Sequence, residues 1–372
     1  MSYALATLWH DRQRFLPGVL AVAFSALLIA LQCGLLLGLF SITSLPIDET
    51  RADIWVGHPA VHSVDLGRHI PIQWQSYLSM PEVTRVEHYR QGFAYWSKPS
   101  GGAELCLVIG SRLGEDALGA VNELRRKERA LLTEPGSVII DESEFDRLGV
   151  ENVGDTAEIN GFRVRIVGTV TGYKSLAGPY IFCSLETARP LLRMTKEQTT
   201  FILARCTTEE GAKTVVQRLQ ARYPKKLSAF TAPDFSIRSR VHWLTKTKAG
   251  IALGFAAALG LFVGAVVTYQ TLSAATLASI KEYAVLRALG IPRWRMAMTV
   301  LTQSFWVGVV GVCLALPFVY GFGLFANWLG AKVHLPWWLL TSAVTVTMCM
   351  ALISGLTALR TLRHVEPMTL LR

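Results

Sequence analysis

Four long stretches of this chain contain no aspartate, glutamate, lysine or arginine. They cover residues 15–47, 249–280, 296–331 and 333–359. Charged residues make up only 17% of the 372 residues, against about 25% in soluble domains, and these stretches account for the deficit. Each stretch exceeds the roughly 20 apolar residues that a helix needs to cross a bilayer. The sequence therefore predicts four transmembrane helices, at 16–40, 249–273, 298–325 and 337–358.

Two other interpretations of these stretches are weaker. Four buried helices of this length in one soluble protein would exceed the usual lengths of soluble helices. The first stretch is also too long for the apolar region of a cleaved signal peptide, and no clean small-residue cleavage site follows it. We expect the first helix to be a retained anchor.

Basic residues in the short segments predict the orientation of the helices, because such residues accumulate on the cytoplasmic side. They occur in the N-terminal segment, between the second and third helices, and in the tail, at Arg12, Arg14, Lys281, Arg287, Arg293, Arg295, Arg360, Arg363 and Arg372. The connection between the third and fourth helices has only Lys332. Both termini are therefore predicted to be cytoplasmic, with residues 41–248 outside.

The segment 41–248 has the pattern of a mixed α/β domain. Strands are predicted at 53–56, 103–109, 137–141, 156–159, 163–170, 180–183 and 201–205. Asn160-Gly161 is typical of a two-residue hairpin turn, because both positions favour positive φ. Thr207 and Glu210 form a capping box before a helix that runs to about Tyr223, and a second helix is predicted at 185–193. The predicted fold is an α-helical membrane protein with a mixed α/β extracytoplasmic domain between helices 1 and 2.

Motifs for catalysis and cofactor binding are missing from the sequence. It has no phosphate-binding loop, no H-E-x-x-H and no G-x-S-x-G, and we predict no catalytic, cofactor or metal residues. His58, His62 and His69 lie near Asp53 and Asp65, where a solvated loop is favoured over a metal site. More than half of the formal net charge of +10 lies in the predicted cytoplasmic segments, so no nucleic-acid partner is predicted.

Three cysteines fall in the outer segment, at Cys106, Cys183 and Cys206. A Cys183–Cys206 disulfide and unpaired core cysteines are both open from the sequence, and core cysteines are favoured.

Small and amide residues predict contacts between the membrane helices. Glycines four residues apart let helix backbones approach closely, and they occur at Gly34, Gly38, Gly260 and Gly264. Packing within the chain and packing in a dimer both fit this pattern. Gln32, Gln270 and Gln303 are expected to form hydrogen bonds between helices rather than to contact a substrate.

The segment between the second and third helices is the most specific part of the sequence. Its residues 281–290 read Lys-Glu-Tyr-Ala-Val-Leu-Arg-Ala-Leu-Gly, which suits a helix closed by Gly290, and Pro292 then opens the next turn. This run resembles the R-E-x-[AG]-x-L-R-A-[LI]-G segment of FtsX/MacB-type ABC transporter permeases, with Lys281 in place of arginine. The ending 358–372 is also similar to the ending of these permeases. The N-terminal residues 10–15, 32–34 and 52–56 are most similar to the DevC-like branch of the family.

The resemblance implies a permease subunit that works as a dimer with a separate ABC ATPase subunit. ATP and Mg²⁺ would bind that partner and not this chain. The residues implied to dock on the ATPase are Ile280, Lys281, Glu282, Leu286, Arg287, Leu289, Gly290, Arg293 and Arg295. The activity implied is export of a lipid, lipoprotein or hydrophobic compound, with a periplasmic adaptor and an outer-membrane exit protein. A mechanical regulator of a periplasmic enzyme and a membrane-anchored sensor are the alternatives.

The same resemblance implies the bacterial inner membrane, with the outer domain in the periplasm. The predicted organisation starts with an amphipathic segment at 1–15 on the inner membrane lipid surface, where Arg12 and Arg14 meet headgroups. The other parts beside the spans are the periplasmic domain 41–248, the docking segment 274–297, the outer loop 326–336 and the tail 359–372.

Overall fold

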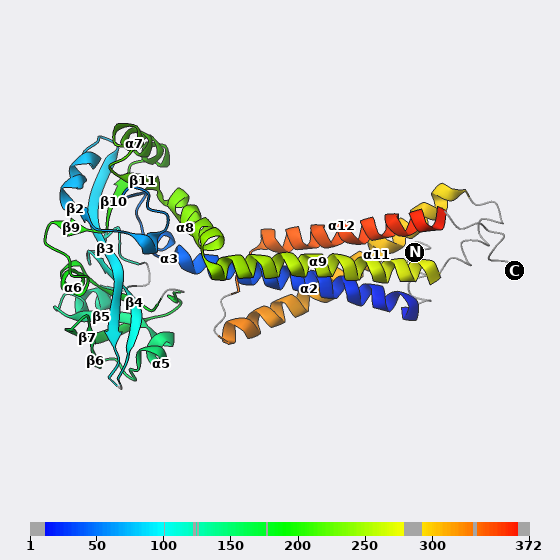
Figure 1. The fold of residues 1–372 in the computed structure, drawn as a ribbon, viewed down its shortest axis with the longest axis horizontal. Helices are drawn as coiled ribbons and strands as arrows, with labels where there is room; N and C mark the ends of the chain where they lie inside the picture. The colour runs from blue at the N-terminus through cyan, green and yellow to red at the C-terminus, as the bar shows by residue number, and fades with distance from the viewer. Residues whose placement is uncertain are drawn as a thin grey trace. The chain divides into compact units, whose positions relative to one another are not determined.

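The computed structural model describes residues 12–99, 101–121, 124, 126–175, 178–278, 292–329 and 333–363. The chain divides into two compact units (Figure 1). The membrane unit comprises residues 1–39 and 248–372, and the inserted domain comprises residues 40–247. A mixed α/β domain thus follows the first apolar helix and precedes the second, as the sequence predicts.

The described residues contain four helices that are long and apolar enough to cross a membrane. They are α2 (Arg12–Thr43), α9 (Lys248–Ala278), α11 (Arg293–Trp328) and α12 (Trp337–Arg363). Each continues beyond its predicted span, because backbone hydrogen bonding does not stop where the apolar run ends. In α11 the helix already begins at Arg293, directly after Pro292.

Inside the membrane unit, α2 packs against α11 and α12. Phe15 and Val22 of α2 are buried with Val307 and Ala351. A second cluster further along α2 joins Ile29 and Ala30 to Val319 and Ala343. Large side chains on other faces remain exposed, as expected for helices whose outer surface meets lipid.

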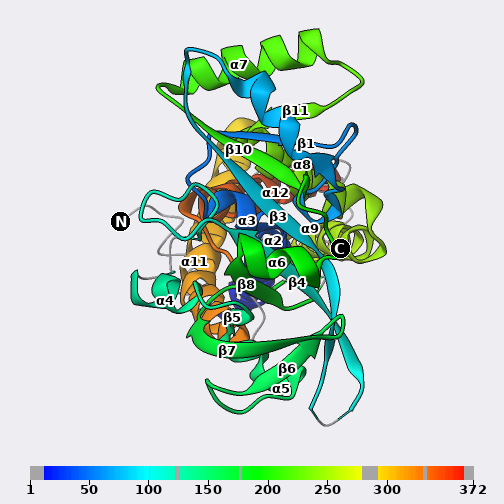
Figure 2. The same cartoon turned by 90° about the vertical axis from the view of Figure 1, so that its left-hand side faces the viewer.

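The inserted domain is built on a nine-stranded sheet among its described residues (Figure 2). Its strands are β1 (Ile54–Gly57), β3 (Val83–Ser97), β4 (Ala103–Ser111), β5 (Ser137–Asp141), β6 (Thr156–Ile159), β7 (Phe162–Val170), β8 (Tyr180–Ser184), β10 (Phe201–Cys206) and β11 (Ser228–Thr231). Their order is β11-β1-β10-β3-β4-β8-β5-β7-β6, and β6 also pairs with β3. The last six strands therefore close into a ring, while β3 also belongs to the open part of the sheet. A separate pair joins β2 (Ile70–Pro71) and β9 (Gln198–Thr199).

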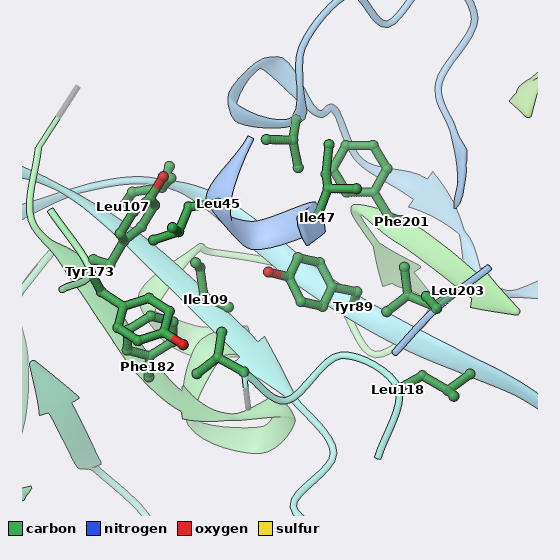
Figure 3. Close-up of a cluster of buried hydrophobic side chains, with 14 of the residues drawn as sticks. Leu45, Ile47, Tyr89, Leu107, Ile109, Leu118, Tyr173, Phe182, Phe201 and Leu203 are labelled. Carbon is green, nitrogen blue, oxygen red and sulfur yellow. The ribbon is translucent and has the colours of Figure 1, made fainter. Parts of the chain in front are cut away.

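Helices cover the sheet and divide its core into clusters. They are α3 (Leu45–Asp48), α4 (Arg126–Leu131), α5 (Phe145–Leu148), α6 (Leu185–Leu191), α7 (Glu209–Arg222) and α8 (Ala232–Lys246), with short 3-10 turns at η1 (Val64–Leu66), η2 (Ile72–Leu78) and η3 (Glu142–Glu144). The strand ring holds one buried cluster, and Val215 and Leu219 of α7 complete another. The third contains Leu45 and Ile47 of α3 and Phe235 of α8 (Figure 3).

The sequence predicted one hairpin turn correctly and placed one helix cap at the wrong residue. Asn160 and Gly161 have φ of 50° and 87° between paired β6 and β7, which confirms the hairpin. The helix cap is Thr208, whose hydroxyl accepts from the amide of Gly211, so the predicted Thr207 capping box is wrong by one residue. Thr207 instead donates its amide to the carbonyl of Glu82, which extends the strand.

The outer cysteines are free and buried. Cys183 lies on β8 and Cys206 on β10, and strands β3 and β4 separate them in the sheet. The two are therefore core cysteines and not a disulfide, which decides the question that the sequence left open.

Candidate functional site

The predicted ATPase-docking residues fall largely outside the described part of the chain. Ile280, Lys281, Glu282, Leu286, Arg287, Leu289 and Gly290 lie in the undescribed range 279–291. Arg293 is the first residue of α11, and the guanidinium of exposed Arg295 lies 5.4 Å from the ring centroid of Trp294. The docking role of this segment stays a prediction.

Two predicted packing glycines lie at the contact between α2 and α9. A Cβ added to Gly260 would collide with the side-chain amide of Gln32 on α2. Only glycine at position 260 leaves room for the Gln32 side chain. The glycine lets the two helices approach closely, in the manner of small residues at membrane helix interfaces.

One helical turn further along α9, polar groups join the same two helices. The buried hydroxyl of Ser25 on α2 lies 2.9 Å from the carbonyl oxygen of Gly264 and 2.9 Å from the hydroxyl of Thr268. A Cβ at Gly264 would approach the Ser25 side chain to 3.2 Å. We call residues Ser25, Gln32, Gly260, Gly264 and Thr268 the helix pair contact. Such hydrogen bonds within a bilayer contribute about 0.6 to 2 kcal/mol each.

The other predicted packing residues lie elsewhere. Gly34 faces the connection between α11 and α12, where its carbonyl accepts from the amide of His334 and a Cβ would meet Leu335. Gln270 on α9 is exposed. Gly38 and Gln303 each take part in an interaction.

In the inserted domain, the residues that follow α2 enter the core directly. Leu45 and Ile47 are 8% and 2% exposed, and they point among Tyr89, Leu107 and Ile109 of β3 and β4 (Figure 3). A buried leucine or isoleucine contributes roughly 1.5 to 3 kcal/mol. Displacing α3 therefore means withdrawing two side chains from the core, so α3 resists independent movement.

The end of α2 is also held by a hydrogen bond from the sheet. The hydroxyl of Tyr180 on β8 donates to the carbonyl oxygen of Ile42 at 3.3 Å. Burial raises the pKa of this phenol well above its ordinary value, so the group remains a donor. The carbonyls in the last turn of a helix lack partners within that helix, and this bond satisfies one of them.

A triangle of polar contacts ties α3 to α8, the last helix of the domain. Arg240 donates through Nε to the hydroxyl of Ser44 at 2.7 Å and through Nη2 to Oδ2 of Asp48 at 2.6 Å. Ser44 in turn donates to the same carboxylate oxygen at 2.6 Å. We call Ser44, Asp48 and Arg240 the clamp. It joins the segment that follows α2 to the helix that precedes α9.

A second anchor holds α8 against the domain core. Phe235 is fully buried, with its ring 5.8 Å from Trp55 and 5.7 Å from Phe201. Further along α8, the indole of Trp243 donates to Oδ2 of Asp65 at 3.0 Å. Burial raises the pKa of Asp65 to about 7, although the indole hydrogen bond lowers it. The clamp, Phe235 and Trp243 hold successive turns of α8.

The predicted histidine loop does not group His62 with the carboxylate of Asp65. His62 faces His242 of α8, and Asp65 turns into the core. Among the described residues there is no group of three histidine, cysteine, aspartate or glutamate side chains that could hold a metal.

The contacts of the helix pair and the clamp suit mechanical linkage, because their groups are engaged in holding one element against another.

Sequence reasoning missed α8 and the clamp. One signal for the helix was present, because Thr231 is followed by proline near the first turn and Asp234 three residues later, and Thr231 caps the helix in the structure. No such signal marks the clamp, because Arg240 lies 192 residues from Asp48.

Comparison with protein families gives one match within the membrane unit. Residues 254–367 match the family model described as FtsX-like permease C-terminal. The matched range begins in α9 and includes α11 and α12, together with the predicted docking segment. No curated protein sequence matches the chain.

Solved structures similar to this chain include three extracytoplasmic or permease domains. The periplasmic region of MacB from Actinobacillus actinomycetemcomitans is 13% identical with a TM-score of 0.35, covering 54% of this chain and 97% of that one. The extracellular domain of the ABC-type transporter YknZ from Gram-positive bacteria is 8% identical with a TM-score of 0.33, covering 48% and 98%. A domain of a putative permease protein from Porphyromonas gingivalis is 15% identical with a TM-score of 0.30, covering 49% and 90%.

Proposed function

We propose that the chain, whose residues 254–367 match the FtsX-like permease family model, is the membrane subunit of an ABC transporter, driven by ATP hydrolysis in a separate subunit. The proposed action is movement of the inserted domain, for export of a lipid, lipoprotein or hydrophobic compound through a periplasmic adaptor and an outer-membrane exit protein. The observation that carries the proposal is the family match over residues 254–367, which includes the segment resembling the docking region of such permeases.

The contacts within each unit support force transmission along the helices. In the membrane unit, the helix pair contact holds α2 and α9 closely together. In the inserted domain, the clamp joins the segment after α2 to the helix before α9. Because both connections of the domain to the membrane helices are held within the domain itself, a displacement of the pair would move the domain as a body rather than unfold its base.

A mechanical role without transport is the second candidate function, and the apolar interior of the candidate spans is consistent with it. The four candidate spans carry mainly apolar side chains. Their buried polar groups are the hydroxyls of Ser25, Thr268, Ser304 and Thr347, among others, and the amide oxygen of Gln32. Charged residues that would mark a hydrophilic path are absent from the described interior of these spans. This arrangement agrees with force transmission, whether the domain moves a substrate or activates an external enzyme.

The proposed setting is the bacterial inner membrane, with both termini in the cytoplasm, the inserted domain in the periplasm and the chain in a dimer. Reporter fusions after residues 14, 150 and 372 test the orientation. A periplasm-active reporter should work only at 150, and activity at either end would refute it.

The main experiment isolates the tagged full chain from its native membrane and identifies the co-purified ATPase subunit. We expect Glu282→Ala and Leu286→Ala to reduce ATPase recovery at least fivefold, since they remove an ion-pairing group and an apolar contact from the proposed dock. The matched control is Glu158→Ala on β6, which changes a carboxylate far along the chain from the dock.

Two results would contradict the docking proposal. One is unchanged ATPase recovery by both dock variants, and the other is equal loss in the Glu158→Ala control. Recovery of an adaptor would favour transport, whereas recovery of a cell-wall hydrolase would favour mechanical regulation.

A further inference from the structure

The inserted domain carries a group of basic side chains on the surface of α8. It consists of His62 from the loop before η1 and Arg238, His242 and Lys246 from α8, and we call it the cationic cluster. His62 and His242 stack with ring centroids 5.6 Å apart and planes 4° from parallel. Nη2 of Arg238 lies 3.1 Å from Nδ1 of His62.

The cluster is held in shape by its own contacts. Arg238 also donates through Nε to the carbonyl of Val61 at 3.1 Å, and its guanidinium lies 5.0 Å from the ring centroid of Phe230. Because guanidinium can only donate, Nδ1 of His62 accepts, and the proton of the neutral ring is then on Nε2. That N–H remains a donor for a further ligand.

Acidic groups of the neighbouring elements are engaged elsewhere. Asp65, in the same loop as His62, is buried and accepts from Trp243. Asp234, at the start of α8, accepts from the hydroxyl of Thr231. Burial lowers the pKa of His242, and the neighbouring basic groups His62, Lys246 and Arg238 lower it further. The cluster is therefore a concentration of positive charge without a neutralising partner among these groups.

An exposed apolar stripe runs along α8 beside the cationic cluster. Ile237 and Val241, four residues apart, are 59% and 49% exposed. The opposite face of α8 is buried through Phe235 and Ser239. A helix with adjoining basic and apolar outer faces is typical of the membrane interface, where the apolar face enters the acyl boundary and the basic residues meet headgroups.

Chain length alone keeps the C-terminal end of this helix near a membrane. Lys246 ends α8, and Lys248 begins α9, the next candidate span. Two residues add at most about 7 Å, and His242 lies about 6 Å along the helix from Lys246. The headgroup layer extends roughly 5 to 8 Å beyond each side of the hydrocarbon core. Lys246, at most about 7 Å along the chain from the start of α9, is therefore within reach of the headgroup layer.

We propose that the cationic cluster binds the phosphate of an anionic phospholipid headgroup, beside the exposed apolar face formed by Ile237 and Val241. Arg238 and Lys246 supply the permanent charge, and Nε2–H of His62 and the imidazole of His242 supply further donors. The site would hold the base of the inserted domain to the leaflet that α9 enters. This inference requires α9 to span a membrane and does not depend on the ATPase.

Proton uptake should accompany lipid binding. Without lipid, burial and the neighbouring basic groups lower the pKa of His242 and favour its neutral form. A bound phosphate supplies the opposite charge and favours the protonated ring. Affinity for an anionic headgroup should therefore rise as the pH falls from 8 to 6.

The test titrates the full chain in dodecyl maltoside with dioctanoyl phosphatidylglycerol, dioctanoyl phosphatidylcholine or inorganic phosphate, by calorimetry at pH 6 and pH 8. We expect phosphatidylglycerol to bind at least fivefold tighter than phosphatidylcholine at pH 6. Lys246→Gln and Arg238→Gln should each weaken phosphatidylglycerol binding about fivefold, the contribution of one basic residue near an anionic surface. Joint replacement of His62 by Asn and His242 by Gln should remove the pH dependence.

The matched control is Lys213→Gln, which removes an exposed lysine from α7 of the same domain. Arg238→Gln also loses a contact to Val61, so the exposed Lys246→Gln keeps the test valid if Arg238→Gln misfolds. Equal affinity for the two lipids, or an equal loss in Lys213→Gln, would overturn the proposal. Inorganic phosphate binding as tightly as phosphatidylglycerol would assign the site to a soluble anion instead. Loss of ATPase recovery with lipid preference intact would reject the permease proposal alone.

Discussion

Replacing Asp65 by asparagine should remove a pH-dependent weakness from the inserted domain. The carboxyl is 5% exposed, its Oδ2 accepts from Trp243, and its Oδ1 has no hydrogen-bond partner among the described residues. Burial raises the pKa of Asp65 from 3.8 to about 7. Asparagine has the same shape, and its carbonyl oxygen can accept the indole hydrogen while its amide stays neutral at every pH.

The sign and size of the effect follow from the raised pKa. Below pH 4 the carboxyl of Asp65 is protonated in both the folded and the unfolded chain, so it does not lower the free energy of unfolding. Between pH 4 and 7 the unfolded chain releases the proton while the folded domain retains it, so stability falls as the pH rises. Above pH 7 the loss levels off. A shift of about 3 units at about 1.4 kcal/mol per unit gives a loss of about 4 kcal/mol.

The assay is urea unfolding of the full chain in detergent, followed by protease sensitivity of residues 40–247, at pH values from 4 to 8. The difference between wild type and Asp65→Asn cancels the other titrating groups, and it should grow in favour of the variant by up to about 4 kcal/mol. Asp116→Asn is the control, because it removes an exposed aspartate. A difference that stays flat across this range, or one matched by the control, would refute the buried-carboxylate reasoning.

Two further changes test the helix pair contact and the clamp. Gly260→Val should destabilise the chain in detergent by about 1 to 3 kcal/mol through overpacking against Gln32, and a second change, Gln32→Ala, should restore thermal stability; no rescue would show that the contact is not close. Arg240→Gln should cost only about 1 kcal/mol, because its partner Asp48 is partly exposed, yet hydrogen exchange in residues 44–49 should quicken several-fold. Unchanged exchange there would show that the clamp does not hold α3.

Features that depend on neighbouring residues were predictable from the sequence. The apolar runs identify the membrane helices because a bilayer requires length and the absence of charge, and both are visible in the chain. The Asn160-Gly161 hairpin was also predictable, since positive φ at two successive positions is a local requirement.

Features that depend on distant partners were not predictable. Strand β3 was missed because it contains charged residues such as Glu87 and Arg90. Only the sheet shows that both are buried with partners, since Glu87 accepts from the amide of Leu118 and Arg90 donates to the carbonyl of Leu185. The pairing of β3 with β6 was also not predictable, because the sequence of a strand does not show which distant strand it pairs with.

The loop around Asp65 shows where sequence information ends. The sequence places three histidines near Asp65 and leaves a metal site and a solvated loop as alternatives. In the structure, the 3-10 turn η1 carries Val64 and Asp65 into the core, while His62 stays outside and stacks on His242 of α8. Composition and local pattern thus determined the membrane helices and the type of domain. The separation of Asp65 from His62 was decided by the tertiary structure, because it depends on α8, whose side chains contact the loop from far along the chain.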